Sequence, residues 1–273
     1  MVRMGTKDIS DVYVGTLNAI GAYFGTEKVW EKSSPPAMYG GLTITAREAN
    51  STVSMIQDSG APSVTLEYST DSVTWNPFVV GTTTVTLNNV GDYVCFRSGP
   101  NGNTTFTTQF TLKCNKFVMT GSVDLSGNLN SIISQDYDNV TTINANGTGG
   151  IGYLFNECTA IVDASKMLMK ATTIGNFTYN RTFWGCSNMT KAPTIFATSI
   201  GDRFSFGDLF HGCSSLQEIK IYYTGNLGGE KTSSWVSGVS NTGTFYYNGS
   251  DTTRGASYIP EGWTITPFTN GGI

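Results

Sequence analysis

The residues that most often perform acid, base or nucleophilic chemistry are sparse in this sequence. The 273 residues include one histidine, His211. A Ser-His-Asp triad would have to use it, yet the chain has no Gly-x-Ser-x-Gly turn. Cys213 stands two residues from His211, a spacing at which side chains do not face each other on a helix. We therefore expect His211 to be a surface or packing residue.

Paired carboxylates are the other arrangement that could support hydrolysis. Asp124, Asp136 and Asp138 are the best acidic candidates among the 20 Asp and Glu residues. Glycosidases need two carboxyl groups at separations of roughly 5–9 Å, which spacing in the sequence does not supply. Solvated loop acids explain the same residues more simply. We therefore predict no catalytic residue and no enzymatic activity, with a polysaccharide depolymerase as an open alternative.

Metal and phosphate sites also lack their usual signatures. The chain has an odd number of cysteines and no Cys-x-x-Cys pair, so neither a disulfide framework nor a zinc site is expected. The glycine-rich stretch 147–150 lacks the Lys-Ser/Thr that completes a P-loop. These observations predict no metal and no cofactor.

The composition indicates what kind of protein must position the remaining side chains. Hydrophobic residues make up 39% of the chain, enough for a core, whereas charged residues make up only 13%, against about 25% in typical soluble domains. The net charge is −4 without a basic stripe, so no nucleic-acid partner is expected. No stretch approaches the roughly 20 apolar residues of a membrane span, and the first residues lack the apolar core of a secretory signal. We expect a β-rich particle, fibre or adhesin protein.

The N-terminal residues contain a short duplication. The segment Val12–Thr16 is echoed by Ala22–Thr26, and the second copy continues to Trp30. Short aromatic and β-branched runs between glycine-containing turns predict a hairpin over residues 1–33. A lone hairpin is marginally stable in water, so it is expected to anchor the chain in a larger particle. The expected anchoring residues are Tyr13, Val14, Tyr23, Phe24, Val29 and Trp30.

After a Ser-Pro linker, residues 38–134 carry short alternating runs separated by turn signals. Such spacing predicts a β-sandwich. Residues 135–222 then show an internal repeat. Phe155, Phe183 and Phe210 are separated by steps of 28 and 27 residues, and a cysteine and an aliphatic column follow the same steps. The expected repeat core is Phe155, Cys158, Ile161, Phe183, Cys186, Met189, Phe210, Cys213 and Leu216.

A period in this range is typical of a leucine-rich-repeat solenoid, whose stacked coils bury a ladder of equivalent residues. The repeat pattern stops after residue 222, and the aromatic-rich segment 223–273 is expected to cap the solenoid. The predicted fold is therefore mainly β, with an N-terminal anchor hairpin, a β-sandwich, a short solenoid and an aromatic C-terminal cap. A possible ligand face would use aromatic residues displayed by the coils, namely Trp184, Phe204, Phe206, Tyr222 and Tyr223.

The repeat units are similar to a known family. The units Phe183–Met189 and Phe210–Leu216, the segment Ala197–Ile200 and the tail around Trp235 and 259–264 resemble the BspA-type leucine-rich repeat. Residues 66–75 resemble the β domain that commonly precedes such repeats, so the resemblance covers roughly residues 40–268. It departs from the family in having only about three repeats, the first of them degenerate.

The resemblance implies an adhesive protein without catalytic residues, found on gut bacteria or in the fibres of their phages. With the duplicated N-terminal hairpin, it favours a head or tail fibre or decoration protein on the virion surface. The expected partners are other virion proteins through the N-terminus, further copies of the chain, and a host-surface glycan or protein. A bacterial cell-surface adhesin is the first alternative and a fibre-borne depolymerase the second.

Overall fold

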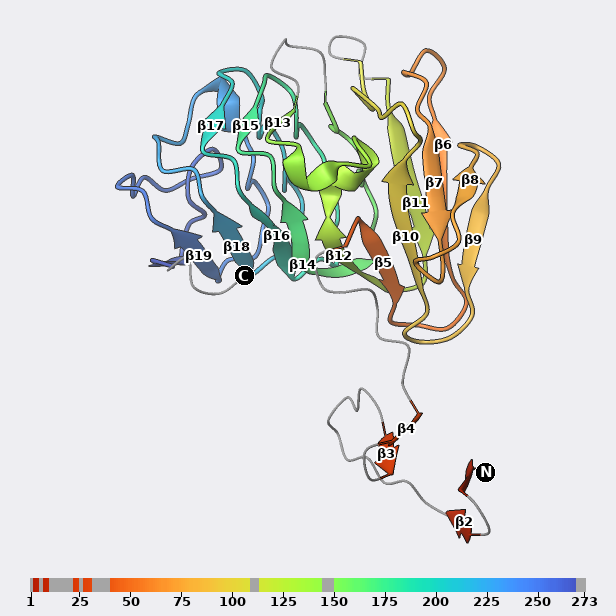
Figure 1. Cartoon of the computed structure of the whole chain (residues 1–273). Coiled ribbons are helices and arrows are strands. Elements are labelled where there is room, and N and C mark those ends of the chain that lie inside the picture. Colours follow the sequence, from red (N-terminus) through yellow and green to blue (C-terminus); the bar gives the residue numbers. More distant parts are fainter. Residues whose placement is uncertain are drawn as a thin grey trace. The chain divides into compact units, whose positions relative to one another are not determined.

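The computed structural model describes residues 40–108, 113–143 and 150–268, together with four short strands in the first 37 residues. The chain divides into two compact units, residues 1–37 and 38–273, the second called here the main unit. Throughout the described residues the fold is mainly β and contains no α-helix (Figure 1). Its short helical turns are the 3₁₀ helices η1 (Leu129–Ile132), η2 (Tyr137–Asn139) and η3 (Glu230–Thr232). None of these turns is long or apolar enough to span a membrane.

The N-terminal unit contains two antiparallel strand pairs. Strand β1 (Val2–Met4) pairs with β2 (Lys7–Ile9), and β3 (Ala22–Phe24) pairs with β4 (Glu27–Trp30). The second pair therefore forms within the second copy of the duplicated motif rather than between the two copies. Only two residues separate β3 from β4, a loop length that suits a tight hairpin. Tyr23 and Phe24 lie in β3 and Val29 and Trp30 in β4, while Tyr13 and Val14 lie outside the described residues.

A ten-stranded mixed sheet runs through the main unit. Strand β12 joins its two halves, because it pairs in parallel with β14 on one side and antiparallel with β5 on the other. The expected regions 38–134, 135–222 and 223–273 thus share one continuous sheet. Its strands, in order across the sheet, are β20 (Thr264–Thr266), β19 (Thr244–Tyr247), β18 (Glu218–Ile221), β16 (Lys191–Ile195), β14 (Ile161–Met169), β12 (Val123–Asn128), β5 (Thr43–Ala46), β10 (Tyr93–Ser98), β7 (Leu66–Ser69) and β8 (Asn76–Phe78).

A three-stranded antiparallel sheet packs against the antiparallel half. It consists of β11 (Asn115–Thr120), β6 (Ser51–Gln57) and β9 (Thr84–Leu87). Its strands alternate buried and exposed residues, as expected of a sheet with one face on the core. The ring of Phe117 on β11 meets Phe96 on β10 with centroids 4.9 Å apart. These contacts tie the two layers together.

The parallel half is built from successive coils with three sides. One side is the ladder β12–β14–β16–β18–β19–β20. The second is a short parallel ladder of β13 (Thr142–Ile143), β15 (Thr173–Ile174) and β17 (Ser199–Ile200). The third, called here the turn side, consists of hydrogen-bonded turns at residues 150–158, 176–186, 203–213 and 230–238. Strands β19 and β20 continue the parallel ladder past residue 222, although the repeat pattern in the sequence stops there.

All nine expected repeat-core residues are buried in this half. The Cys186 thiol donates to the carbonyl of Phe155 at 3.1 Å, and the Cys213 thiol donates to that of Phe183 at 3.0 Å. Each thiol thus satisfies a carbonyl of the preceding coil. Burial raises the pKa of Cys158 to about 11, and all five cysteines are free.

A continuous file of aromatic rings passes through both halves of the main unit. Successive rings have centroids 4.9–6.2 Å apart, a range in which aromatic pairs attract. Phe155 stands at the junction, stacked on Phe117 at 5.5 Å and on Phe183 at 5.2 Å. We call this file the aromatic spine; its members are Tyr68, Phe78, Phe96, Phe117, Phe155, Phe183, Phe210, Trp235, Phe245 and Tyr247.

Candidate ligand-binding surface

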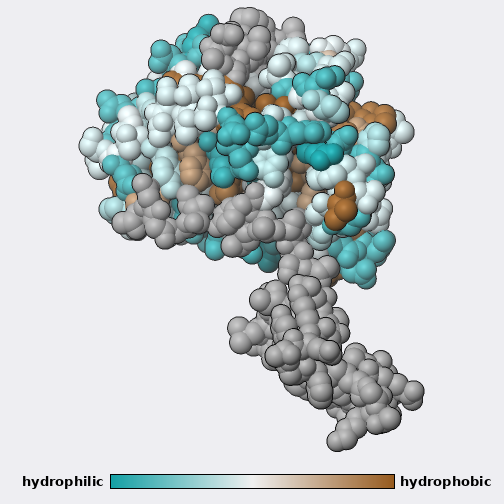
Figure 2. Space-filling model, in the orientation of Figure 1, coloured by the Kyte–Doolittle hydropathy of each residue, from teal (hydrophilic) through white to brown (hydrophobic). Residues whose placement is uncertain are grey.

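The outward face of the parallel sheet presents side chains in rows. On β18, Ile219 and Ile221 are fully buried, whereas Glu218, Lys220 and the following Tyr222 are partly exposed. A parallel ladder keeps equivalent residues side by side, so the outward positions of β18 continue as rows on β19, with which it pairs without a register shift. In the view of Figure 2 the surface is mostly white to teal, with separate brown patches. This agrees with a polar but weakly charged chain.

Three rings form an aromatic row where these strands end. Phe196 stacks on Tyr222 with centroids 4.7 Å apart, and Phe268 meets Tyr222 edge to face at 4.8 Å. All three are partly exposed. Phe196 and Tyr222 each cover one face of the other ring. The Tyr222 side chain is partly exposed, and its hydroxyl makes no hydrogen bond to another described residue.

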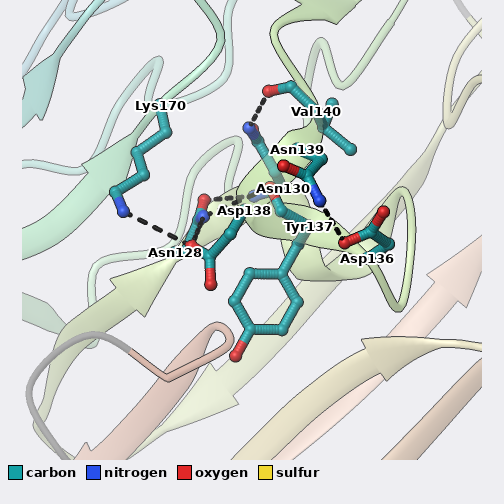
Figure 3. Close-up of polar contacts among 8 residues, drawn as sticks. All are labelled: Asn128, Asn130, Asp136, Tyr137, Asp138, Asn139, Val140 and Lys170. Atoms are coloured by element: carbon teal, nitrogen blue, oxygen red, sulfur yellow. Dashed lines mark hydrogen bonds and ion pairs between the residues drawn. The ribbon is translucent and has the colours of Figure 1, made fainter.

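A polar cluster continues the row on its other side. Lys170 follows β14 and is the neighbour of Phe196, since Met169 pairs with Ile195. Its ammonium lies 3.4 Å from a carboxylate oxygen of Asp138, which also accepts from the Asn128 amide at 3.3 Å. Figure 3 shows Lys170 reaching toward this carboxylate. The Asp138 side chain is 63% exposed, so it keeps acceptor capacity for a ligand.

A second pair of rows adds charge to this face. The Lys220 ammonium lies 3.1 Å from a Glu218 carboxylate oxygen and 5.1 Å from the Tyr246 ring centroid on β19. Such cation–π contacts hold an ammonium in place while leaving part of it solvated. The face therefore combines partly exposed aromatic rings, a phenol, ammonium groups and carboxylates. These groups suit a polar, hydroxyl-rich ligand laid across the strands.

The five aromatic residues expected on one ligand face do not lie together. Tyr222 belongs to the aromatic row described above. Phe206 is fully buried and Tyr223 is 9% exposed, so both belong to the core, which corrects the expectation for them. Trp184 and Phe204 lie on the turn side, where Phe204 packs on Phe177 at 5.4 Å.

His211 also lies on the turn side, in a cluster around Arg181. The Arg181 guanidinium bonds to Asp208 at 3.0 Å and to the Tyr153 hydroxyl at 3.1 Å. The Nδ1 atom of His211 lies 3.4 Å from Asp208, and its ring lies 6.1 Å from Trp184. The Cys213 thiol is buried and donates to a backbone carbonyl, so it is not placed to act as a nucleophile with His211.

The three acidic candidates separate into two places along β12. Asp124 lies near the start of the strand and pairs with Arg47 at 3.1 Å. Burial raises the pKa of Asp124, and Arg47 opposes that shift. Asp138 contacts the end of the strand, while Asp136 accepts from the Asn139 amide at 2.8 Å within the same turn (Figure 3). The three carboxylates therefore do not converge on one site.

Tyr222 was among the residues expected on a ligand face, whereas Phe196, Phe268 and Lys170 beside it were not. Positions 170, 196, 222 and 248 are each 26 residues apart, the same step that separates the paired residues Met169, Ile195, Ile221 and Tyr247 just before them in the parallel ladder. These positions hold Lys, Phe, Tyr and Asn, so the row does not form a repeat of identical residues in the sequence. Asn248 exchanges two hydrogen bonds with the backbone of Phe268, which holds the last ring of the row in place.

Among the described residues, no group of three or more His, Cys, Asp or Glu side chains could hold a metal ion. Comparison of the chain with models of known protein families, with curated proteins and with solved structures finds no match.

Proposed function

We propose that this chain is a non-enzymatic phage virion protein, a head or tail fibre or decoration protein. In this proposal a short leucine-rich-repeat solenoid of the BspA type binds a host-surface glycan. The solenoid is built on a β-sandwich base. The stacked parallel coils, with buried repeat columns at steps of 28 and 27 residues, support the solenoid reading. The packing of the antiparallel strands in two layers supports the sandwich reading.

The observation that carries the proposal is the outward face around the aromatic row. It brings Phe196, Tyr222 and Phe268 together beside Lys170 and Asp138, although these residues are far apart in the sequence. Partly exposed rings, a phenol without a hydrogen-bond partner and exposed charged groups offer weak contacts that suit hydroxyl groups. Weak contacts become useful when many copies act together, which is the situation on a particle surface.

The N-terminal unit supplies the second part of the proposal. Residues 1–37 form a compact unit of their own with paired strands β3 and β4. Such a small unit buries little surface by itself, so a partner protein would complete it. We assign it the role of docking on the capsid or tail through Tyr13, Val14, Tyr23, Phe24, Val29 and Trp30.

Binding of the full chain to host cells and to host-derived glycans tests the adhesive function. Tyr222→Ala and Lys170→Ala should each weaken binding by about tenfold, since each removes a contact worth about 1.4 kcal/mol per site. Tyr222→Phe removes the hydroxyl but keeps the ring, so it shows how much each contributes to binding. Trp184→Ala is the matched control, because it removes a partly exposed aromatic side chain on the turn side.

Three outcomes would argue against this assignment. Loss of binding in Trp184→Ala with full binding in Tyr222→Ala would move the ligand surface to the turn side. Equal binding by all variants would remove adhesion from the main unit. Release of sugar products from the glycan by the purified chain, abolished by replacing a carboxylate such as Asp138, would favour a depolymerase.

A further inference from the structure

The backbone hydrogen bonds that join successive coils on the turn side all run in one direction. In the described turns, N–H groups of each coil donate to carbonyls of the coil that follows it in the sequence. One row illustrates the pattern. The N–H of Glu157 donates to the carbonyl of Trp184 at 2.6 Å, that of Gly185 to His211 at 2.8 Å, and that of Gly212 to Ser237 at 2.7 Å.

This pattern aligns whole peptide groups along the stack. The carbonyl of Trp184 and the N–H of Gly185 belong to the same peptide group, which accepts on one side and donates on the other. The peptide groups 184–185, 211–212 and 237–238 therefore form a head-to-tail chain. Each carries a dipole of about 3.5 D, and aligned hydrogen-bonded dipoles reinforce one another. As at a helix N-terminus, the end with free N–H groups attracts negative charge.

The hydrogen-bonded series of peptide groups 184–185, 211–212 and 237–238 ends at the N–H of Gly238. Two neighbouring rows end on partners, since Val236 donates to the carbonyl of Ala256 at 3.1 Å and Ser234 to the Ser257 hydroxyl at 2.9 Å. The Gly238 N–H has no hydrogen-bond partner among the described residues, and Gly238 is exposed. One row of aligned dipoles thus ends in an accessible, unpaired donor.

A pocket of about 220 Å³ lies at this end of the stack. Besides Gly238, its wall includes Ser237, Ser240 and Asn241, whose side chains can donate hydrogen bonds. Arg254 donates to the carbonyl of Pro260, another wall residue, at 3.3 Å, which brings a cation to the region. Glu261 also lines the pocket and opposes an incoming anion.

We infer that this pocket binds a carboxylate group, with the acidic sugar of a host glycan as its source. The unpaired Gly238 N–H and the aligned peptide chain behind it supply the attraction, and the serine and asparagine side chains complete the hydrogen bonds. The choice of an acidic sugar rests on the proposed adhesive function, whereas the preference for a carboxylate rests on the pocket alone.

Amide resonances in the ¹H–¹⁵N NMR spectrum of the full chain give a direct test. Titration with sodium glucuronate should shift the Gly238 amide saturably, while glucose and matched sodium chloride should leave it in place. Glu261→Gln should tighten glucuronate binding by about threefold, because it removes a nearby like charge. Glu48→Gln, which neutralises an exposed glutamate in a loop outside the pocket, should change nothing.

Equal shifts with glucose and glucuronate, or no shift at Gly238 with either probe, would overturn the inference. Failure of the proposed function would look different. In that case glucuronate would still shift Gly238, but the chain would bind neither host cells nor acidic glycans. Sodium acetate distinguishes the two parts of the ligand, since a carboxylate site should respond to acetate even if the sugar ring contributes nothing.

Discussion

Phe155 is the residue whose replacement should affect the main unit most broadly. Its side chain is fully buried and its ring stacks on Phe117 and Phe183, which belong to the antiparallel and parallel halves. Phe155→Ala should lower the free energy of unfolding by about 4 kcal/mol, within the range for buried phenylalanines. The two ring contacts account for about 2 kcal/mol of that, and lost burial and the cavity account for the rest. For a domain of this size, the melting temperature should fall by about 10 °C.

Hydrogen exchange in increasing denaturant can follow both halves of the variant at once. Because the sheet and the aromatic spine are continuous, amides of β10 and β18 should lose protection together and by the same free energy. Phe196→Ala is the control, since this partly exposed ring lies outside the spine and its loss should cost only about 1 kcal/mol. Unchanged protection in β10 with lost protection in β18 would mean that the halves fold independently, which would refute the reasoning.

Three further measurements check local features. Tyr179 is fully buried with an unpartnered hydroxyl, so Tyr179→Phe should leave stability unchanged or raise it by about 1 kcal/mol in urea denaturation; a loss would contradict this. The backbone N–H groups of Thr74 and Val73 hold the pKa of Asp71 well below its usual range. Asp71 should therefore stabilise the fold above about pH 4 and lose this effect as pH falls, a dependence that Asp71→Asn should remove in acid denaturation. The five buried thiols should react with a thiol reagent only after unfolding; rapid labelling of the folded chain would contradict their burial.

The mainly β fold agrees with the prediction, and the repeated residues of the parallel half could be recognised because they recur periodically. Phe155, Phe183 and Phe210 occupy equivalent places in successive coils, so identical residues recur at nearly constant steps and mark a buried column. The parallel ladder continues past residue 222, but no repeated residues mark it there, so the sequence pattern did not predict it. Trp235 packs on Phe210 there without repeating the Phe-x-Gly-Cys pattern, and β19 still pairs with β18.

The two halves are connected by long-range strand pairings that have no recognisable pattern in the local sequence. Strand β12 pairs with β5, which lies much earlier in the sequence, and with β14, which follows it. The alternation of apolar and polar residues in β12 does not predict either partner. Sequence patterns were also a poor guide to which aromatic residues are buried and which are exposed. On the turn side, residues such as Phe204 adopt positive φ, which breaks the simple periodicities used to separate inward from outward positions.

The proposed function places this chain on a phage particle, held there by its N-terminal unit. Cryo-electron microscopy can compare particles that carry the full chain with particles that carry the chain without residues 1–33. We expect projecting density for the main unit with the full chain and loss of that density with the shortened one. Particles that never contain the protein would contradict the claim and favour a bacterial surface role.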